Sequence, residues 1–183
     1  MATRNKTEFE ANNIYFITFT ICEWQKILTS QKYFDLFYEW FDHQKEKYQN
    51  KIHGYVIMPN HFHGLIYISD KSPPIPKLIQ NAKRFMAYKI SKYLLEDNKQ
   101  DILELFSQAA RREKGARHKV FEDRYDSKIM SNADLYHQKL NYIHNNPCKP
   151  PWNLADTPER YTHSSALNYE KGIGHYDVDV LYE

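Results

Sequence analysis

A chain of 183 residues is long enough for one domain and too short for two full ones. Hydrophobic residues make up 42% and charged residues 26%, a balance typical of globular proteins that excludes wholesale disorder. No apolar run approaches the roughly 20 residues that cross a bilayer, residues 1–10 lack a signal-peptide core, and two cysteines make neither a disulfide framework nor a metal cluster. We therefore expect a single domain over 1–183 with its core at about 14–169, loose tails, no membrane partner and a cytoplasmic location.

The net charge of +2 hides an uneven distribution. Residues 76–119 contain eleven of the 25 Lys and Arg but only five of the 23 Asp and Glu, so this stretch carries a local +6 and the remainder −4. A solvated helix face followed by a polar loop is the ordinary explanation. A groove that follows phosphates is the alternative, and charge alone does not decide between them.

The first half of the chain predicts a strand, a helix and a hairpin. Residues 14–22 alternate β-branched and aromatic side chains, as a half-buried strand does. Residues 31–50 repeat apolar side chains at i, i+3, i+4 and i+7, which predicts an amphipathic helix. The apolar runs 51–58 and 61–69 are joined by Pro59-Asn60, a tight-turn signal, so they predict a β-hairpin.

The second half predicts two more helices around a short helix and a strand. Residues 77–96 are helical in pattern, 102–110 form a short helix, and 120–130 supply a strand. Ser131 and Asn132 are N-cap candidates for a last helix that Pro147 must end. The order β-α-β-β-α-β-α predicts an α+β fold, a ferredoxin-like antiparallel sheet with helices packed mainly on one face.

The hairpin contains the first candidate for chemistry, His61-Phe62-His63 at the start of its second strand. Side chains at i and i+2 of a strand point to the same face, so the two imidazoles converge while Phe62 faces the other way. Two convergent imidazoles are two of the ligands that a divalent metal needs. A chance His-x-His is common in a chain with nine histidines, so this motif requires support from elsewhere.

The last predicted helix contains the second candidate. Tyr142 and Asn146 are i and i+4 and therefore lie on one face, beside a buried stripe of Tyr136, Leu140 and Ile143. Tyr142 is thus expected at the border of the buried face, with a carboxamide one turn on. Taken alone, this is equally explained by a half-buried tyrosine in a chain that has fifteen.

The two motifs occur in a specific order. Met58-Pro59-Asn60-His61-Phe62-His63-Gly64 is followed, about eighty residues later, by Tyr142-Ile143-His144-Asn145-Asn146-Pro147. Together they closely resemble the REP-associated tyrosine transposases, within the wider single-tyrosine HUH transposases of small prokaryotic insertion sequences. The similarity extends through Gln138-Lys139-Leu140-Asn141 and Tyr161-Thr162-His163-Ser164-Ser165-Ala166, and covers roughly residues 14–169.

This resemblance implies a set of roles. His61 and His63 would hold a divalent cation, Mg²⁺ or Mn²⁺, with Asn146 as third ligand and Tyr142 as nucleophile. The reaction would nick and rejoin single-stranded or hairpin DNA through a 5′-phosphotyrosine intermediate, which conserves bond energy as hydrolysis does not. A tyrosine hydroxyl has an ordinary pKa near ~10 and needs activation. The resemblance also implies a homodimer and a prokaryotic, nucleoid-associated location.

The resemblance gives the basic stretch a function as well, because a DNA backbone attracts Lys and Arg without regard to base sequence. Departures from the family pattern at Phe121-Glu122, Cys148 and His163 concern substrate choice more than catalysis. His144 is expected at the surface. The predicted phosphate contacts are Lys83, Arg84, Arg111, Arg112, Lys114 and Arg117.

Two other functions stay open at this point. A relative that binds repeat hairpins without cleaving them would explain the basic stretch, although it would gain nothing from keeping His61, His63 and Tyr142. A metal-dependent phosphodiesterase, in which water attacks and Tyr142 is structural, would explain the histidines. Only nicking through a tyrosine leaves protein covalently linked to DNA.

Overall fold

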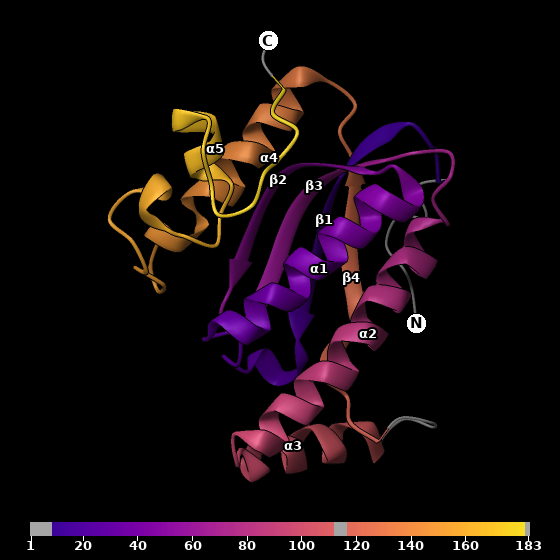
Figure 1. The fold of residues 1–183 in the computed structure, drawn as a ribbon, viewed down its shortest axis with the longest axis vertical. Helices are drawn as coiled ribbons and strands as arrows, with labels where there is room; N and C mark the ends of the chain where they lie inside the picture. Colours follow the sequence, from indigo (N-terminus) through magenta and orange to yellow (C-terminus); the bar gives the residue numbers. More distant parts are fainter. Residues whose placement is uncertain (1–8, 112–116, 182–183) are drawn as a thin grey trace.

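A computed structural model describes residues 9–111 and 117–181, and the chain forms a four-stranded antiparallel sheet with helices on both sides (Figure 1). The strand order is β2-β3-β1-β4, and every neighbouring pair is antiparallel. This order, with a helix after the first and third strands, is the ferredoxin-like arrangement that the sequence predicts. The strands are β1 (Asn13–Ile21), β2 (Lys51–Met58), β3 (His61–Ile68) and β4 (Phe121–Ile129).

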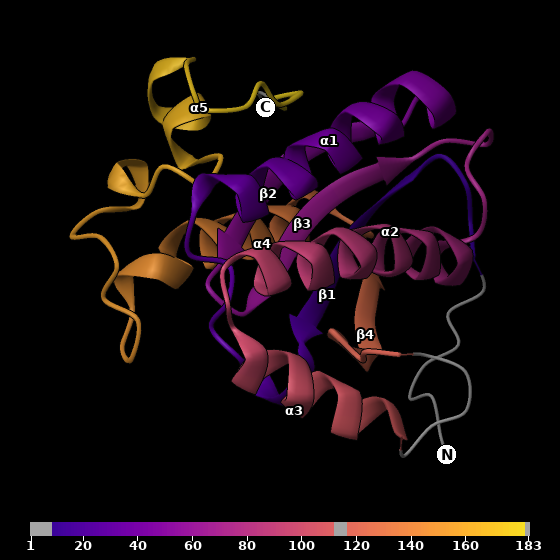
Figure 2. The ribbon, with the colours of Figure 1, turned by 60° about the horizontal axis from the view of Figure 1, so that its bottom comes forward.

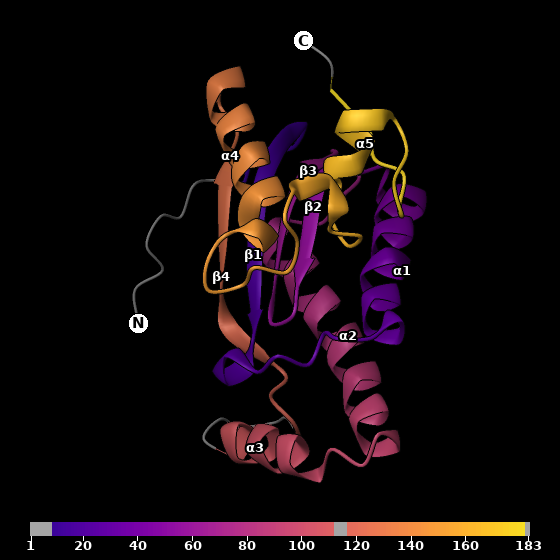
Figure 3. The ribbon, with the colours of Figure 1, turned by 90° about the vertical axis from the view of Figure 1, so that its left-hand side faces the viewer.

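The long helices lie on both faces of this sheet. The helices α1 (Gln31–Tyr48) and α2 (Ile75–Glu96) cover one face, as predicted. The helix α4 (Ala133–Asn145) lies across the other face, and Figure 3 shows the two layers on opposite sides of the strands. Shorter segments are α3 (Gln100–Arg111), α5 (Ala166–Lys171) and three 3₁₀ turns, η1 (Cys22–Trp24), η2 (Asn146–Cys148) and η3 (Pro158–Arg160).

The main core lies between the sheet and α1 and α2. Alternate residues of β1 and β3 enter it, because successive side chains of a strand point to opposite faces. Phe19 and Phe62 lie with ring centroids 5.1 Å apart, and Phe37 of α1 stacks on Phe19 at 6.1 Å. A separate, smaller cluster of seven buried residues holds α4 on the opposite face.

The C-terminal segment is docked, whereas the sequence analysis expects loose tails. Tyr176 stacks on Tyr38 of α1 with centroids 5.5 Å apart, and its hydroxyl donates to Asp42 at 2.6 Å. The backbone N–H of Asp179 donates to the Ile52 carbonyl at 2.8 Å, so the segment pairs with β2 at the edge of the sheet. An exposed strand edge is a liability that proteins cover, and this pairing explains the difference.

The helix α3 lies beyond the end of α2, beside the start of β4 (Figure 2), where the Lys119 N–H donates to the Phe106 carbonyl at 2.9 Å. It carries a strongly apolar side, with Phe106 and Ala110 buried. Within residues 9–111 and 117–181, no helix is both long enough and apolar enough to span a bilayer.

Candidate active site

The strand β3 separates its side chains as the alternation predicts. Phe62 is fully buried in the core against α1, while His61 and His63 lie on the face that α4 covers. The two imidazole rings contact each other at right angles, with centroids 4.7 Å apart. Both are almost buried, at 7% and 6% exposure. The pair is therefore convergent and shielded from bulk water.

Each imidazole is oriented by a polar neighbour on the Nδ1 side of its ring. The Nδ1–H of His61 donates to Oδ1 of Asn60 at 2.6 Å, and Nδ1 of His63 lies 2.7 Å from the hydroxyl of Thr18, its partner across β1 and β3. Because Nδ1 of His61 carries the donated proton, its lone pair is on Nε2, which is the atom that can act as a ligand or acceptor. Outer hydrogen bonds of this kind are what hold metal-binding histidines in place.

One nitrogen of the pair is unusual in its surroundings. Nε2 of His63 is buried and finds no hydrogen-bond partner within the described part of the chain. The side chain of Asn146 hydrogen-bonds to His61. A buried polar atom without a partner is rare in folded proteins and calls for an explanation, and here it lies beside a second imidazole and a carboxamide.

Burial keeps both histidines neutral. It lowers the pKa of His61 to about 4, against a smaller opposing effect of the Asn146 hydrogen bond. Burial also lowers the pKa of His63, with further lowering from the neighbouring His61 and from Lys139. Neutral imidazoles keep the lone pairs that a cation requires.

The helix α4 brings Tyr142 over this pair. The Asn132 side chain caps the helix by accepting from the Leu135 N–H at 2.8 Å, so the predicted N-cap is confirmed. The Tyr142 ring lies at right angles to His63, with centroids 5.1 Å apart, and remains 41% exposed. A tyrosine that touches a buried imidazole and still reaches solvent can meet a substrate arriving from outside. The ammonium of Lys139 lies 5.4 Å from the Tyr142 ring centroid.

The segment 161–165 explains why α4 keeps this position. Its Ser165 hydroxyl lies 2.9 Å from Nε2 of His144 and accepts from the Tyr55 N–H of β2 at 2.9 Å. His144 is therefore buried, and not at the surface as expected, because its imidazole links α4 to the strand β2. Gly54 of the same strand allows close approach, since a Cβ there would meet Cδ1 of Leu140 at 2.8 Å. The segment 161–165, which follows Tyr142 in the sequence, thus fixes α4 against β2.

The donor set at this position suits a divalent cation with mixed nitrogen and oxygen ligands. Two imidazole nitrogens and one amide oxygen would come from His61, His63 and Asn146. No group of three His, Cys, Asp or Glu side chains that could hold a metal occurs among the described residues, so Asn146 is the side chain that would complete the set. Such ligands leave coordination positions open for phosphate oxygen.

Three residues that lie around the site are not predicted from the sequence. Trp24 and Trp152 contact the His61 ring, with centroids 6.3 Å and 5.7 Å away. Lys26 lies 5.1 Å from the Trp152 ring centroid. These residues belong to loops far apart in the sequence, and no periodicity or motif spacing could have assigned them to the site.

The basic stretch is less uniform than the sequence suggests. Lys83 is half-buried, and its ammonium donates to the backbone carbonyls of Glu122, Asp123 and Arg124 at 2.7, 3.2 and 3.3 Å. Burial lowers the pKa of Lys83 to about 8. Lys83 thus stabilises the start of β4, and this corrects its prediction as a phosphate contact.

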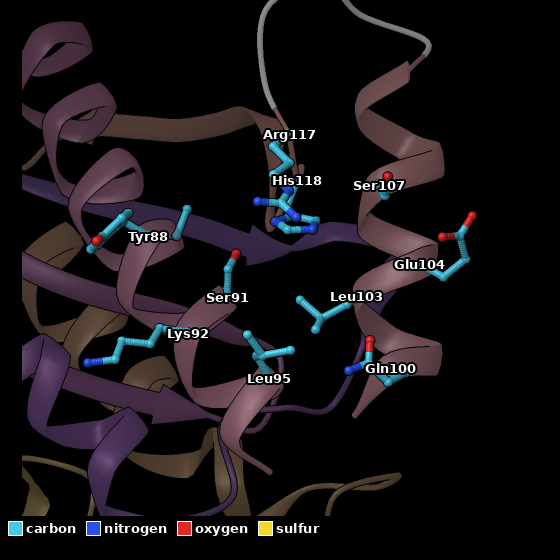
Figure 4. A pocket seen from close by; sticks show the side chains of 11 residues that line it. Tyr88, Ser91, Lys92, Leu95, Gln100, Leu103, Glu104, Ser107, Arg117 and His118 are labelled. Atoms are coloured by element: carbon cyan, nitrogen blue, oxygen red, sulfur yellow. The ribbon is translucent and has the colours of Figure 1, made fainter. Parts of the chain in front are cut away.

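Of the other predicted contacts, the structure describes the side chains of Arg84 and Arg117. Arg84 is exposed on α2. Arg117 and His118 lie at one side of a pocket of about 700 Å³ between α2 and α3 (Figure 4). Arg111 ends α3, with its side chain outside the described set, and Arg112 and Lys114 lie outside the described residues.

No protein-family model matches the sequence, and neither does any curated protein. Among solved structures, one described as a REP-associated tyrosine transposase bound to a REP hairpin aligns with 100% of this chain and 95% of its own, with a TM-score of 0.66 and 14% sequence identity. The chain has the fold of that transposase. A candidate transposase from Deinococcus radiodurans aligns with 78% of this chain and 97% of its own, with a TM-score of 0.45 and 13% identity.

Proposed function

We propose that this protein binds single-stranded or hairpin DNA and nicks and rejoins it through Tyr142. The observation that carries the proposal is the Tyr142 ring on α4, partly exposed and 5.1 Å from the ring of His63, beside a second buried neutral imidazole. The shared fold with a transposase bound to a REP hairpin supports a DNA substrate. We propose the domain over 1–183 as the working unit.

His61, His63 and Asn146 would hold a divalent cation, Mg²⁺ or Mn²⁺. When bound, the cation withdraws charge from the scissile phosphate and stabilises the negative charge that develops there. Asn60 and Thr18 keep the two imidazoles oriented, so the ligands are preorganised.

Tyr142 supplies the nucleophile. Its hydroxyl oxygen attacks the phosphorus, the bond from phosphorus to the 3′-oxygen breaks, and a 5′-phosphotyrosine and a free 3′-hydroxyl result. The phenolic proton leaves to the solvent that reaches the exposed side of the ring, and the departing 3′-oxygen takes up a proton from the same solvent. A 3′-hydroxyl can then attack the phosphotyrosine and rejoin the strand.

Detection of a covalent adduct tests this proposal. Wild-type protein is incubated with a pool of hairpin oligonucleotides and Mn²⁺, and protein-linked DNA is resolved on a denaturing gel. Tyr142→Phe should lose all adduct while it keeps its fold and its DNA affinity, because only a hydroxyl is removed and the ring still packs. Tyr136→Phe is the matched control: its buried hydroxyl is bonded to Tyr169 at 2.8 Å, so its adduct should persist.

The same gel separates the alternatives. Cleaved DNA without an adduct would indicate a phosphodiesterase in which water attacks. Binding without cleavage would indicate a repeat-binding protein. An adduct that persists in Tyr142→Phe and disappears in Tyr136→Phe would move the nucleophile to Tyr136.

Metal titration by calorimetry tests the ligands. We expect His61→Ala and His63→Ala each to lose Mn²⁺ binding and nicking, because the imidazoles are preorganised. Asn146→Ala should be milder, since water can replace a neutral carboxamide. If Asn146→Ala loses metal as completely as His61→Ala, the ranking of the ligands is wrong. If neither histidine variant loses it, the site itself is wrong.

The basic stretch would hold the DNA backbone through Arg84, Arg117 and the predicted Arg111, Arg112 and Lys114. Neutralising Arg111 and Arg112 should weaken binding similarly for cognate and scrambled hairpins. Each lost phosphate contact should flatten the plot of log affinity against log salt by about 0.7 for single strands or about 0.9 for a duplex stem. A loss confined to the cognate hairpin would indicate base recognition by these arginines.

From the same resemblance we propose that the protein acts as a homodimer on DNA in the prokaryotic cytoplasm, associated with the nucleoid. Light scattering after gel filtration, with and without a hairpin, measures the mass of the protein and of the complex. A monomer in both conditions would contradict the dimer.

A further inference from the structure

Two tryptophans from distant parts of the chain meet at His61. Trp24 follows β1, and Trp152 follows η2 after α4. Trp24 lies edge-on to the His61 ring and is 61% exposed, while Trp152 is half-buried. A single exposed indole is ordinary on a protein surface, so the neighbours of Trp24 decide what it can do.

The backbone at Trp24 forms a turn with two left-handed residues, and this turn positions the exposed indole. Glu23 and Trp24 have φ values of 52° and 55°, in the left-handed region that residues with a Cβ rarely adopt. Two side chains hold the turn: the Glu23 N–H donates to Glu122 at 2.8 Å, and the Asn60 amide donates to the Trp24 carbonyl at 3.0 Å. Asn60 also accepts from His61, so one residue orients both the imidazole and the indole.

Two lysine ammonium groups lie close to aromatic rings around the site. Lys26 lies 5.1 Å from the Trp152 ring centroid, and Lys139 lies 4.6 Å from that of Phe16, next to Tyr142. Aromatic rings interspersed with ammonium groups are the pattern by which proteins hold single-stranded nucleic acid, because bases stack on the rings and phosphates approach the cations.

We propose that Trp24 is a platform on which an unpaired base next to the scissile phosphate stacks, with Lys26 against a neighbouring phosphate. The inference rests on the proposed function for its unpaired DNA substrate and adds the residue on which a base of that DNA stacks. A base inside a duplex has both faces covered by the neighbouring base pairs, whereas an unpaired base can turn one face to an indole. Trp24 contacts the ring of His61, a proposed metal ligand, so a base that stacks on Trp24 would lie next to the proposed metal site.

The experiment measures binding without cleavage, so that it does not depend on the adduct. The full chain carrying Tyr142→Phe is titrated with short single strands that contain 2-aminopurine at successive positions, and with a blunt duplex of the same sequence. Adding Trp24→Ala should weaken single-strand binding about 5-fold to 150-fold and leave duplex binding unchanged. It should also abolish the quenching of 2-aminopurine at one position, and Trp24→Phe should restore most of both.

Tyr88→Ala is the matched control, because Tyr88 is an aromatic residue of α2 with 77% exposure, away from His61. It should leave single-strand affinity and quenching unchanged. Unchanged single-strand affinity in Trp24→Ala, or equal losses for single strand and duplex, would overturn the platform. Trp24-dependent quenching, combined with no adduct from wild-type protein that keeps Tyr142, would keep the platform and reject the nicking chemistry, so the two failures are distinguishable.

Discussion

The two faces of the sheet are built from the same strands but carry different side chains. On the face of α1 and α2, aromatic rings such as Phe19, Phe37 and Phe62 fill a continuous apolar core. On the face of α4, a small apolar cluster surrounds buried histidines and ends at exposed aromatic rings. The difference shows how a period of two lets one strand serve both stability and chemistry, since Phe62 and His63 are neighbours in sequence and lie in different layers.

The largest difference in stability and nicking should come from comparing Phe62→Ala with His63→Ala. Phe62→Ala removes a fully buried ring that contacts Phe19 and Phe37, so we expect about 3–5 kcal/mol less free energy of unfolding. His63→Ala should destabilise less, because it also removes a buried nitrogen without a partner, but it should abolish nicking. Urea denaturation and the adduct assay measure the two effects. Equal stability losses would mean that both faces contribute alike to the core.

The pH dependence of the free energy of unfolding should reveal the contribution of His144, a buried residue of α4. Burial lowers the pKa of His144 from 6.5 to about 4, so between these values the unfolded chain binds a proton that the folded chain does not. The contribution of His144 to stability is therefore fully present above pH 6.5 and is lost as pH falls toward 4, by up to about 1.4 kcal/mol for each pH unit. His144→Gln should reduce this slope in denaturation curves at pH 7 and pH 4.5. An unchanged slope would show that His144 does not titrate between those values.

Much of this architecture could be predicted from the sequence. The predicted hairpin at 51–58 and 61–69 matches β2 and β3 almost residue for residue, because Pro59-Asn60 fixes the turn and hydrophobic alternation fixes the faces. The juxtaposition of His61, His63 and Tyr142 was predictable only from the paired motifs, since nothing local to β3 or α4 indicates that they meet.

Contacts between loops could not be predicted in this way. The position of Trp24 depends on two left-handed residues and on hydrogen bonds to Asn60 and Glu122, none of which has a periodic signature. Lys83 illustrates the same limit: a lysine on a helix predicts an exposed cation, but the backbone carbonyls at the start of β4 bind it instead. Charge counting along a sequence does not distinguish these outcomes.

The two glycines of the hairpin offer a third, smaller comparison. A Cβ at Gly64 would meet Cζ of Phe62 at 2.5 Å, within the packed aromatic core, whereas one at Gly54 would meet the mobile end of Leu140 at 2.8 Å. Overpacking typically costs about 1–3 kcal/mol, and we expect Gly64→Ala near the upper end and Gly54→Ala near the lower. Hydrogen exchange should show faster opening of α4 in Gly54→Ala. If exchange in α4 rises more in Gly64→Ala, the two layers are coupled more tightly than their separate clusters indicate.

The smallest expected change in stability comes from the residues at the N-cap positions of α4 and α1. The Asn132 side chain accepts from the Leu135 N–H at the start of α4, so Asn132→Ala should cost about 1 kcal/mol. Ser30 occupies the same position before α1 but makes no side-chain capping bond, so Ser30→Ala should change stability by less than about 0.5 kcal/mol. The helix α1 is held by a large apolar face, whereas α4 rests on a small cluster and depends more on its end. Chemical denaturation measures both variants, and an equal loss in the two would mean that packing, and not capping, decides where α4 begins.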